Sequence, residues 1–194
     1  CDWSSDVCSP DLAGKSTLAC ALVRQGWRLL ADDLVAITAE GMVLPGIPRI
    51  KLWEDAMRSF GWSPEQGIPV ASGMAKYLIP AVHLRPAPAP ARLAQLYLLQ
   101  REPWDGISPL PRRAIGREQE AMAELLNQLY RPGFVRGLGH QGSSFLALAR
   151  LMRQAPLTTL AIPDTIADLI EALTTTDLLS SEPESPTPPL ESPI

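Results

Sequence analysis

Five consecutive residues near the start of the chain, Ala13, Gly14, Lys15, Ser16 and Thr17, combine the groups that a phosphate-binding loop needs. Glycine allows backbone N–H groups to converge on phosphate oxygens, and lysine can reach the β- and γ-phosphates of a nucleotide. A serine hydroxyl can hold Mg²⁺, and the N-terminus of the helix that follows adds N–H donors and the positive end of a dipole. We therefore expect these five residues to bind ATP, with Ser16 as a ligand of Mg²⁺.

The motif lacks its first half. The full pattern, Gly-x-x-x-x-Gly-Lys-(Ser or Thr), would place a glycine at position 9, where the chain has Ser9 followed by Pro10. The front of the loop and the strand before it are therefore absent or replaced in this sequence. Because a Gly-Lys-Ser triplet at the start of a helix also arises by chance, the motif alone leaves an ordinary helix N-terminus open.

Two adjacent carboxylates, Asp32 and Asp33, lie 17 and 18 residues after Lys15. A short helix, one glycine turn and a strand between them would return the chain to the loop. Successive side chains on a strand point to opposite sides, so one of the two aspartates can face the metal and the other can accept a proton from an attacking hydroxyl as a general base. The alternative is a turn or a solvated strand end with no chemistry.

The close spacing of the lysine loop and the two aspartates resembles the kinase domain of the HPr kinase/phosphorylase family. In that family a phosphate loop leads into a helix, which is followed by a glycine, a basic residue and an aliphatic-Ala-Asp-Asp-x-Val segment. The matching stretches here are Gly14–Thr17 and Gly26–Val35. The resemblance is clear over residues 13–37 and weak beyond them.

This resemblance implies ATP- and Mg²⁺-dependent phosphorylation of a serine hydroxyl. It places Lys15 at the phosphate-binding lysine, Ser16 at the Mg²⁺-binding serine and Asp33 at the catalytic base. With Asp33 in that role, we expect Asp32 to face the metal. The family also has a histidine upstream of the loop and a metal-binding glutamate in an Arg-Gly segment, and residues 45–56 (PGIPRIKLWEDA) contain no such segment. In this respect the chain is more similar to diverged HPr kinase-like proteins encoded beside peptide-modification genes, which implies a protein or peptide acceptor other than HPr.

Two other classes of function stay open at this point. The sequence Gly-Lys-Ser-Thr-Leu is shared with transporter ATPases, although the Leu-Ser-Gly-Gly-type signature and the longer separation to the metal-side aspartate of that class are missing. A nucleotide-sensing or scaffold domain without catalysis is the third hypothesis. Among other charged residues, Arg49 and Lys51 could hold a phosphate or an acidic substrate, and Arg131 or Arg136 could supply a transition-state cation; each could equally be solvated surface.

The charge and hydropathy of the chain limit the classes of partner that it is expected to bind. The formal charge of −4 argues against a generic nucleic-acid binder. Residues 1–12 and 180–194 each carry three acidic residues and no basic one, so residues 13–179 carry +2, which suits an anionic ligand. No apolar run reaches the length of a membrane span, and no signal peptide is visible. We expect a cytoplasmic protein that binds neither membranes nor nucleic acid, and the resemblance adds homo-oligomers because family members form rings.

Three segments are expected. Residues 1–12 resemble adapter DNA translated at the end of an assembled reading frame, or else form an ordinary flexible terminus, and residues 180–194 are rich in proline and glutamate and are expected to be disordered. Between them, residues 13–179 are expected to form one P-loop kinase-like domain that is truncated at its N-terminus.

Alternating helices and strands predict an α/β fold with a central, mixed sheet flanked by helices. Helices are expected at 15–25, 54–60, 118–130 and 143–154, with a last helix that Asp164 caps. Strands are expected along 31–38 and at 77–84, 93–99 and 157–162. Because Pro80 interrupts the strand at 77–84, that strand is expected at an edge of the sheet.

Overall fold

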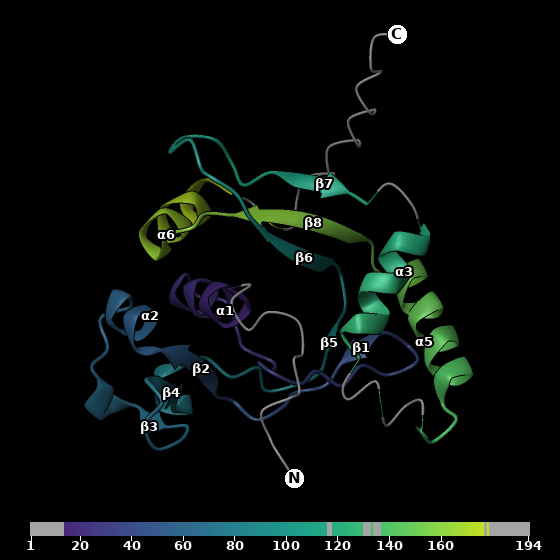
Figure 1. Cartoon of the computed structure of the whole chain (residues 1–194), viewed down its shortest axis with the longest axis horizontal. Coiled ribbons are helices and arrows are strands. Elements are labelled where there is room, and N and C mark those ends of the chain that lie inside the picture. The colour runs from purple at the N-terminus through teal and green to yellow at the C-terminus, as the bar shows by residue number, and fades with distance from the viewer. Residues whose placement is uncertain (1–13, 116–117, 130–132, 134–136, 177, 179–194) are drawn as a thin grey trace, which may run out of the picture.

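The computed structural model describes residues 14–115, 118–129, 133, 137–176 and 178 (Figure 1). The predicted segment 1–12, the tail at 180–194 and the predicted site residue Ala13 lie outside the described residues, as do Arg131 and Arg136. Within the described part, the chain is a mixed α/β structure in which helices pack around three small sheets.

Helix α1, Lys15–Arg24, follows the predicted bounds to within one residue. Its buried face carries Leu18, Cys20, Ala21 and Val23. The helix ends in a Schellman motif: Gly26 has a φ of 106°, its N–H bonds the carbonyl of Val23 at 3.0 Å, and the N–H of Trp27 bonds the carbonyl of Leu22 at 3.1 Å. The glycine therefore stops the helix as the sequence predicts.

The first sheet has the order β6–β8–β7 and is mixed, as predicted. Strand β8, Leu157–Ile162, has the predicted bounds and pairs parallel with β6, Leu96–Arg101, and antiparallel with β7, Arg112–Ala114. Strand β8 is largely buried and consists of apolar and β-branched residues, which explains why it could be predicted from the sequence. The expected strand at 93–99 is shifted toward the C-terminus by about three residues, and β7 was not predicted.

The second sheet has the order β2–β4–β3 and is antiparallel. It contains β2 at Ile50–Trp53, β4 at Lys76–Ile79 and β3 at Ile68–Pro69. Strand β4 lies in the middle, so the expectation of an edge strand was wrong. Pro80 follows the last residue of β4, so its missing backbone N–H costs that strand no hydrogen bond to its neighbours.

The predicted strand along Ala31–Thr38 does not form. That stretch makes one isolated bridge, between Ile37 and Val43, and the aspartates lie in a bend. Just before it, Leu29 bridges Pro86 through two backbone hydrogen bonds of 2.7 Å. The single central sheet was therefore also a wrong expectation: a third, two-stranded sheet pairs β1, Met42–Val43, with β5, Ala91–Arg92.

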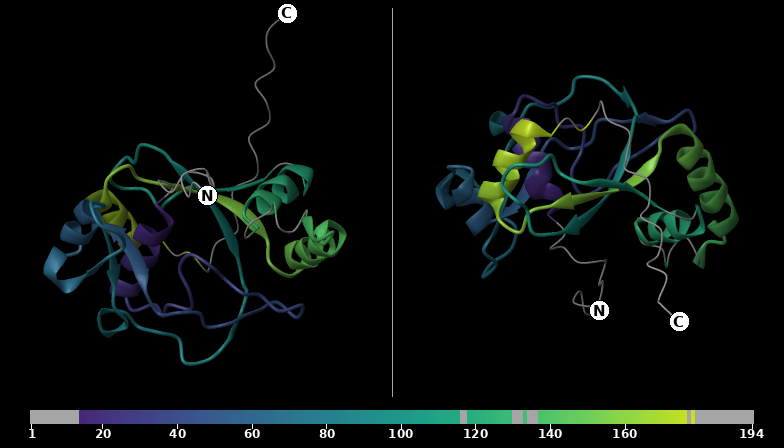
Figure 2. Two further views of the ribbon diagram at one scale, coloured as in Figure 1. Left: turned by 60° about the horizontal axis from the view of Figure 1, so that its bottom comes forward. Right: turned by 90° about the horizontal axis from the view of Figure 1, so that it is seen from above.

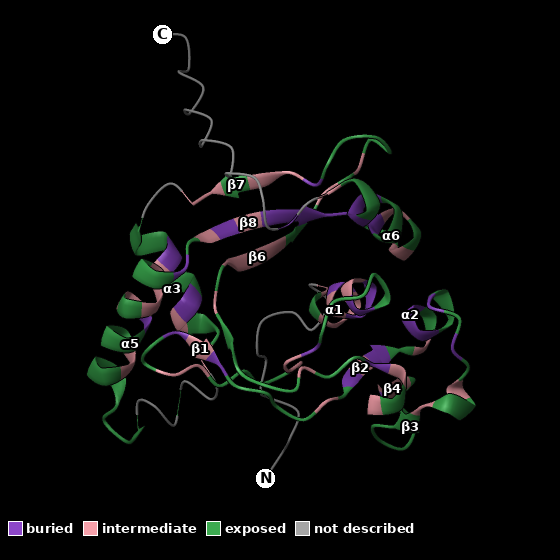
Figure 3. Ribbon diagram, turned by 180° about the vertical axis from the view of Figure 1, so that it is seen from behind, coloured by how far each residue is buried: buried purple, intermediate pink, exposed green. Residues whose placement is uncertain are grey.

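Four further α-helices and two short 3-10 helices, at Pro64–Gln66 and Ala81–His83, also lie in the described part. The α-helices are α2 at Glu54–Ser59, α3 at Glu118–Asn127, α5 at Gln141–Gln154 and α6 at Ile166–Thr175. The cap of α6 is Thr165, whose hydroxyl accepts the N–H of Asp168 at 3.1 Å, and not Asp164 as predicted. The pair α3 and α5 stays at the opposite end of the molecule from α2 and α6 (Figure 2), and α5 is largely exposed with Leu148 as its buried residue (Figure 3).

Helix α1 lies between the β6–β8–β7 sheet and the β2–β4–β3 sheet, and it contacts both β2 and α6 (Figure 1). One cluster of buried apolar side chains joins these parts and includes Leu18 and Cys20 of α1, Ile50 and Leu52 of β2, and Leu160 and Ile162 of β8. The start of α1 is therefore held at the junction of two sheets, and the carboxylate pair lies beside it.

Candidate functional site

Ser16 and Asp32 meet as the sequence predicts. The Ser16 hydroxyl, in the first turn of α1, donates a hydrogen bond of 2.9 Å to Oδ1 of Asp32, sixteen residues further along the chain. Both side chains are partly buried. The lysine-bearing helix start and the acidic bend are thus neighbours, although the bend replaces the strand that was expected to position the aspartates.

Lys51, at the second position of β2, fixes both carboxylates. Its backbone N–H donates a hydrogen bond of 3.0 Å to Oδ2 of Asp32, and its ammonium group forms an ion pair with Oδ2 of Asp33. Sequence reasoning left Lys51 open between a ligand group and solvated surface. The alternation of buried Ile50 and Leu52 with Lys51 was the available signal, because it predicts a short strand that turns the lysine away from the core.

The environments of the two carboxylates differ. Burial raises the pKa of Asp32, although the hydrogen bonds from Lys51 and Ser16 counteract this effect, and the neighbouring charge of Asp33 raises the pKa further. The side chain of Asp33 is 48% exposed. A bound cation would favour the charged form of Asp32, so this carboxylate is suited to a metal, whereas Asp33 is reachable from solvent.

Gly14 makes the tight turn before α1. Its φ is 80°, and a Cβ at this position would lie 2.9 Å from Cδ1 of Ile162 and 3.5 Å from Nη2 of Arg101. Ile162 and Arg101 end the parallel strands β8 and β6, so the turn sits at the carboxyl edge of the sheet. This is the edge at which ligands of open α/β sheets bind.

Lys15 begins α1, is exposed and makes no ion pair with another described residue. Arg101 was not identified from sequence as a neighbour of the loop. Its Nη1 donates to the carbonyls of Pro163 and Asp164, at 3.1 and 2.8 Å, which holds the guanidinium beside Gly14. Thr17 is partly buried on α1, and no hydrogen bond of its side chain to another described residue is recorded.

The start of α1 and the acidic bend offer a metal ion only a small set of oxygen donors. Among the described residues, no group of three or more His, Cys, Asp or Glu side chains could hold an ion. The Ser16 hydroxyl and Oδ1 of Asp32 nevertheless lie 2.9 Å apart. Magnesium is commonly bound by one or two protein oxygens together with substrate phosphates and water, so this donor set fits Mg²⁺ only when it arrives with a phosphate ligand.

A cavity of about 290 Å³ adjoins the acidic bend. It is lined by Ala31, Asp32, Asp33, Leu34, Ala36, Leu44, Pro45, Gly46, Ile47 and Arg49. The first five lining residues belong to the acidic bend and its continuation, and the other five belong to the segment that leads into β2. The predicted residue Arg49 therefore lies near the carboxylates, at the edge of this cavity.

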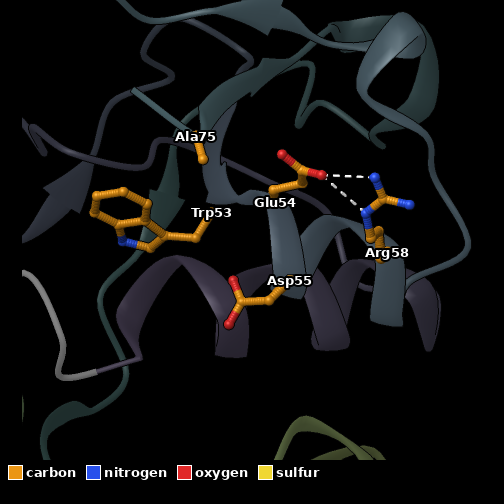
Figure 4. Close-up of a pocket in the computed structure, with 5 residues that line it drawn as sticks. All are labelled: Trp53, Glu54, Asp55, Arg58 and Ala75. Atoms are coloured by element: carbon orange, nitrogen blue, oxygen red, sulfur yellow. Dashed lines mark hydrogen bonds and ion pairs between the residues drawn. The ribbon is translucent and has the colours of Figure 1, made fainter. Parts of the chain in front are cut away.

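A second hollow, of about 580 Å³, opens where β2 ends and α2 begins (Figure 4). It is lined by Trp53, Glu54, Asp55, Arg58 and Ala75. Oε1 of Glu54 accepts hydrogen bonds of 3.0 and 2.6 Å from Arg58, and Asp55 points away from that pair. None of the sequence-predicted site residues lines this hollow, so we place the candidate site at the smaller cavity and the helix start.

Comparisons with protein-family models, with curated proteins and with solved structures found no match to this chain. In the part of the chain that the structure describes, no helix has the length and hydrophobicity needed to cross a membrane.

Proposed function

We propose that this chain carries a P-loop kinase-like site that transfers the γ-phosphoryl group of ATP, with Mg²⁺, to a serine or similar hydroxyl of a protein or peptide. The observation that carries the proposal is the 2.9 Å hydrogen bond between Ser16 and Asp32 at the N-terminus of α1. In phosphate-loop enzymes, the loop serine and a nearby aspartate are the two protein groups that hold the metal. The resemblance of residues 13–37 to the HPr kinase/phosphorylase family supports the same reading.

Each described residue has a distinct task in this proposal. Gly14 allows the backbone to approach a phosphate, and the exposed Lys15 reaches the β- and γ-phosphates. Ser16 and Asp32 hold Mg²⁺, which when bound neutralises charge on the phosphoryl group. Lys51 keeps Asp32 and Asp33 in place through its backbone and its ammonium group.

The reaction is an in-line displacement. The oxygen of the acceptor hydroxyl forms a bond to the γ-phosphorus while the bond from that phosphorus to the β–γ bridging oxygen breaks, and its electron pair leaves with ADP. The hydroxyl proton passes to the carboxylate of Asp33. Positioning and charge neutralisation supply most of the rate in such transfers.

The nucleotide site is tested by binding of a fluorescent ATP analogue with and without Mg²⁺. Ser16→Ala removes one metal donor and is expected to weaken Mg²⁺-dependent binding about tenfold or more, a difference of about 1.4 kcal/mol. Ser143→Ala is the matched control, because Ser143 also lies in the first turn of a helix, where its hydroxyl donates a hydrogen bond of 2.9 Å to the carbonyl of His140. Equal binding by both variants would contradict the metal role of Ser16.

Transfer is tested with γ-labelled ATP and a library of serine peptides. Asp33→Asn is expected to lose transfer and keep nucleotide binding, because the amide cannot accept the hydroxyl proton. Undiminished transfer by this variant removes Asp33 from the base role.

A nucleotide-binding domain without transfer is the second candidate, and one observation favours it. The carboxylate of Asp33 is already engaged by the ammonium group of Lys51. In that case Mg²⁺-dependent binding would persist, and no label would reach any peptide. Release of labelled phosphate to water without an acceptor would instead identify an ATPase.

A further inference from the structure

We propose that the 290 Å³ cavity beside the carboxylates is the acceptor subsite, and that it takes a peptide with an aliphatic side chain next to its hydroxyl residue and an acidic side chain nearby. This inference rests on the proposed function and extends it by naming the acceptor class. Asp32 and Asp33 form one end of the cavity, and Arg49 lies in its lining.

The cavity walls are built by backbone hydrogen bonds and do not depend on a ligand. The N–H of Leu44 bonds the carbonyl of Ala36 at 2.9 Å, and the N–H of Gly46 bonds the carbonyl of Leu30 at 2.7 Å. Gly46 fits closely there, since a Cβ would lie 3.0 Å from Cβ of Ala31. The acidic bend and the segment before β2 are therefore fixed against each other.

The lining explains the preference for an aliphatic residue. Leu34, Leu44 and Ile47 are 55%, 38% and 64% exposed, although their side chains are apolar. Clustered exposed apolar groups beside a polar site are typical of a binding surface. A volume of about 290 Å³ lies just below the range of about 300–1,000 Å³ found for ligand pockets, which suits one or two side chains of a peptide.

The charges explain the preference for an acidic residue. Asp32 accepts hydrogen bonds from Ser16 and Lys51, and Asp33 is paired with Lys51, so both carboxylates in the lining already have donors. The guanidinium of Arg49 makes no ion pair in the described part of the chain. Arg49 is therefore the charged side chain of the lining that has no partner among the described residues, and it favours a carboxylate on the occupant.

Occupation of the cavity would place the neighbouring hydroxyl at Asp33. The oxygen of that hydroxyl then forms the bond to the γ-phosphorus, its proton goes to Asp33, and ADP leaves with the electron pair of the broken bond. The apolar side chain acts as an anchor, and Arg49 acts as a positioning residue with no part in the bond changes.

The experiment uses the full chain, γ-labelled ATP and four peptides. The reference peptide is acetyl-Gly-Glu-Gly-Leu-Ser-Leu-Gly-Glu-Gly-amide; a second has asparagine in place of both leucines, a third has lysine in place of both glutamates, and a fourth has alanine in place of serine. We expect the KM of the second and third peptides to exceed that of the reference about five- to tenfold, as loss of one apolar anchor or one exposed ion pair implies. The fourth peptide takes no label.

Two variants with matched controls test the assignment to this cavity. Arg49→Glu is expected to reverse the charge preference, so that the lysine peptide becomes the better acceptor, and Ile47→Ser is expected to reduce the leucine preference. Arg150→Glu, on the exposed face of α5, and Ile107→Ser, at a residue that is 81% exposed, leave both preferences unchanged. The KM for ATP is measured in parallel to separate acceptor binding from nucleotide binding.

The outcomes separate the two proposals. If no peptide in the wider serine library accepts label, both the proposed function and this inference are contradicted. Transfer that ignores the leucines and glutamates, or preferences that Arg49→Glu and Ile47→Ser do not move, leaves the kinase standing and overturns the acceptor subsite.

Discussion

Asp32 is held by two donors in a place where its charge is costly. The Ser16 hydroxyl and the Lys51 N–H satisfy its oxygens, yet burial still raises its pKa. A raised carboxyl pKa means that the folded state holds the proton more tightly than the unfolded chain does. The ionised form of Asp32 therefore destabilises the fold, and the destabilisation grows as the pH rises from the ordinary pKa of aspartate through the raised one.

Asp32→Asn is expected to raise the melting temperature of the ligand-free protein at neutral pH. Asparagine can keep both contacts, since its carbonyl oxygen accepts the Lys51 N–H and its amide donates to the Ser16 hydroxyl. The difference from the wild type should close as the pH falls below the ordinary pKa of aspartate, which thermal melting across pH measures. A variant that is less stable than the wild type at neutral pH would show that burial of the charge is not the dominant effect.

The same variant is expected to lose the extra stability that Mg²⁺ and ATP confer together, because a ligand that binds only the folded state raises its stability by mass action. Melting with the nucleotide alone, with the metal alone and with both separates the two effects. If Mg²⁺ and ATP raise the melting temperature of Asp32→Asn as much as that of the wild type, the metal binds at another place.

At the level of elements, the start of α1 depends on one conformation of Gly14. A non-glycine residue at a φ of 80° costs about 1–2 kcal/mol, and here a Cβ would also press on Ile162. We expect Gly14→Ala to lower the free energy of unfolding by about 2 kcal/mol or more, measured by urea denaturation. Gly73→Ala is the matched control, because Gly73 has a φ of 76° and nothing within 4 Å of its Cβ position.

The two glycine variants together measure the contact with Ile162. If Gly14→Ala and Gly73→Ala cost the same, the left-handed conformation alone sets the requirement. A greater cost at Gly14 shows that the close approach to β8 adds to it, and the same variant should then weaken nucleotide binding.

The cap of α6 gives a second test at this scale. Thr165→Ala removes the hydroxyl that accepts the N–H of Asp168, and we expect a loss of about 1 kcal/mol in the free energy of unfolding. Asp164→Ala, at the residue that the sequence suggested as the cap, should change it by less than about 0.5 kcal/mol. The reverse ranking in urea denaturation would contradict the cap that the structure assigns.

The elements differ in how readable they were from sequence. Helix α1 and strand β8 were predicted nearly to the residue, because α1 has a periodic apolar face with Gly26 at its end and β8 consists of apolar and β-branched residues. The prediction was wrong for Ala31–Thr38, because the aliphatic residues of this segment suggest a strand. In the structure Leu34 and Val35 are exposed, and Asp32 accepts hydrogen bonds from Ser16 and Lys51. Tertiary contacts decide such a segment, and local composition does not contain them.

The candidate site was predictable only in part, for the same reason. The meeting of Ser16 and Asp32 followed from the spacing of loop, helix and turn. The roles of Lys51 and Arg101 did not, because both come from strands whose pairing partners are distant in sequence: Lys51 pairs with Leu78, and Arg101 with Ile162. Long-range register has no signature in one sequence.

At the scale of the whole molecule, stability depends on the core that joins the sheets to α1. Leu160 is fully buried in the central strand of its sheet, and Leu160→Ala is expected to lower the free energy of unfolding by about 2–5 kcal/mol through the cavity that it leaves. Leu146→Ala, at a residue of α5 that is 58% exposed, should stay within about 0.5 kcal/mol of the wild type. Urea denaturation of the pair checks the difference.

One residue of β2 grips both acidic side chains, by its main chain at Asp32 and by its ammonium group at Asp33. The positions of the two carboxylates are therefore coupled through that strand. A shift of β2 against α1 would change the distance of both from Ser16 at once, so the packing between strand and helix sets the geometry of the whole site.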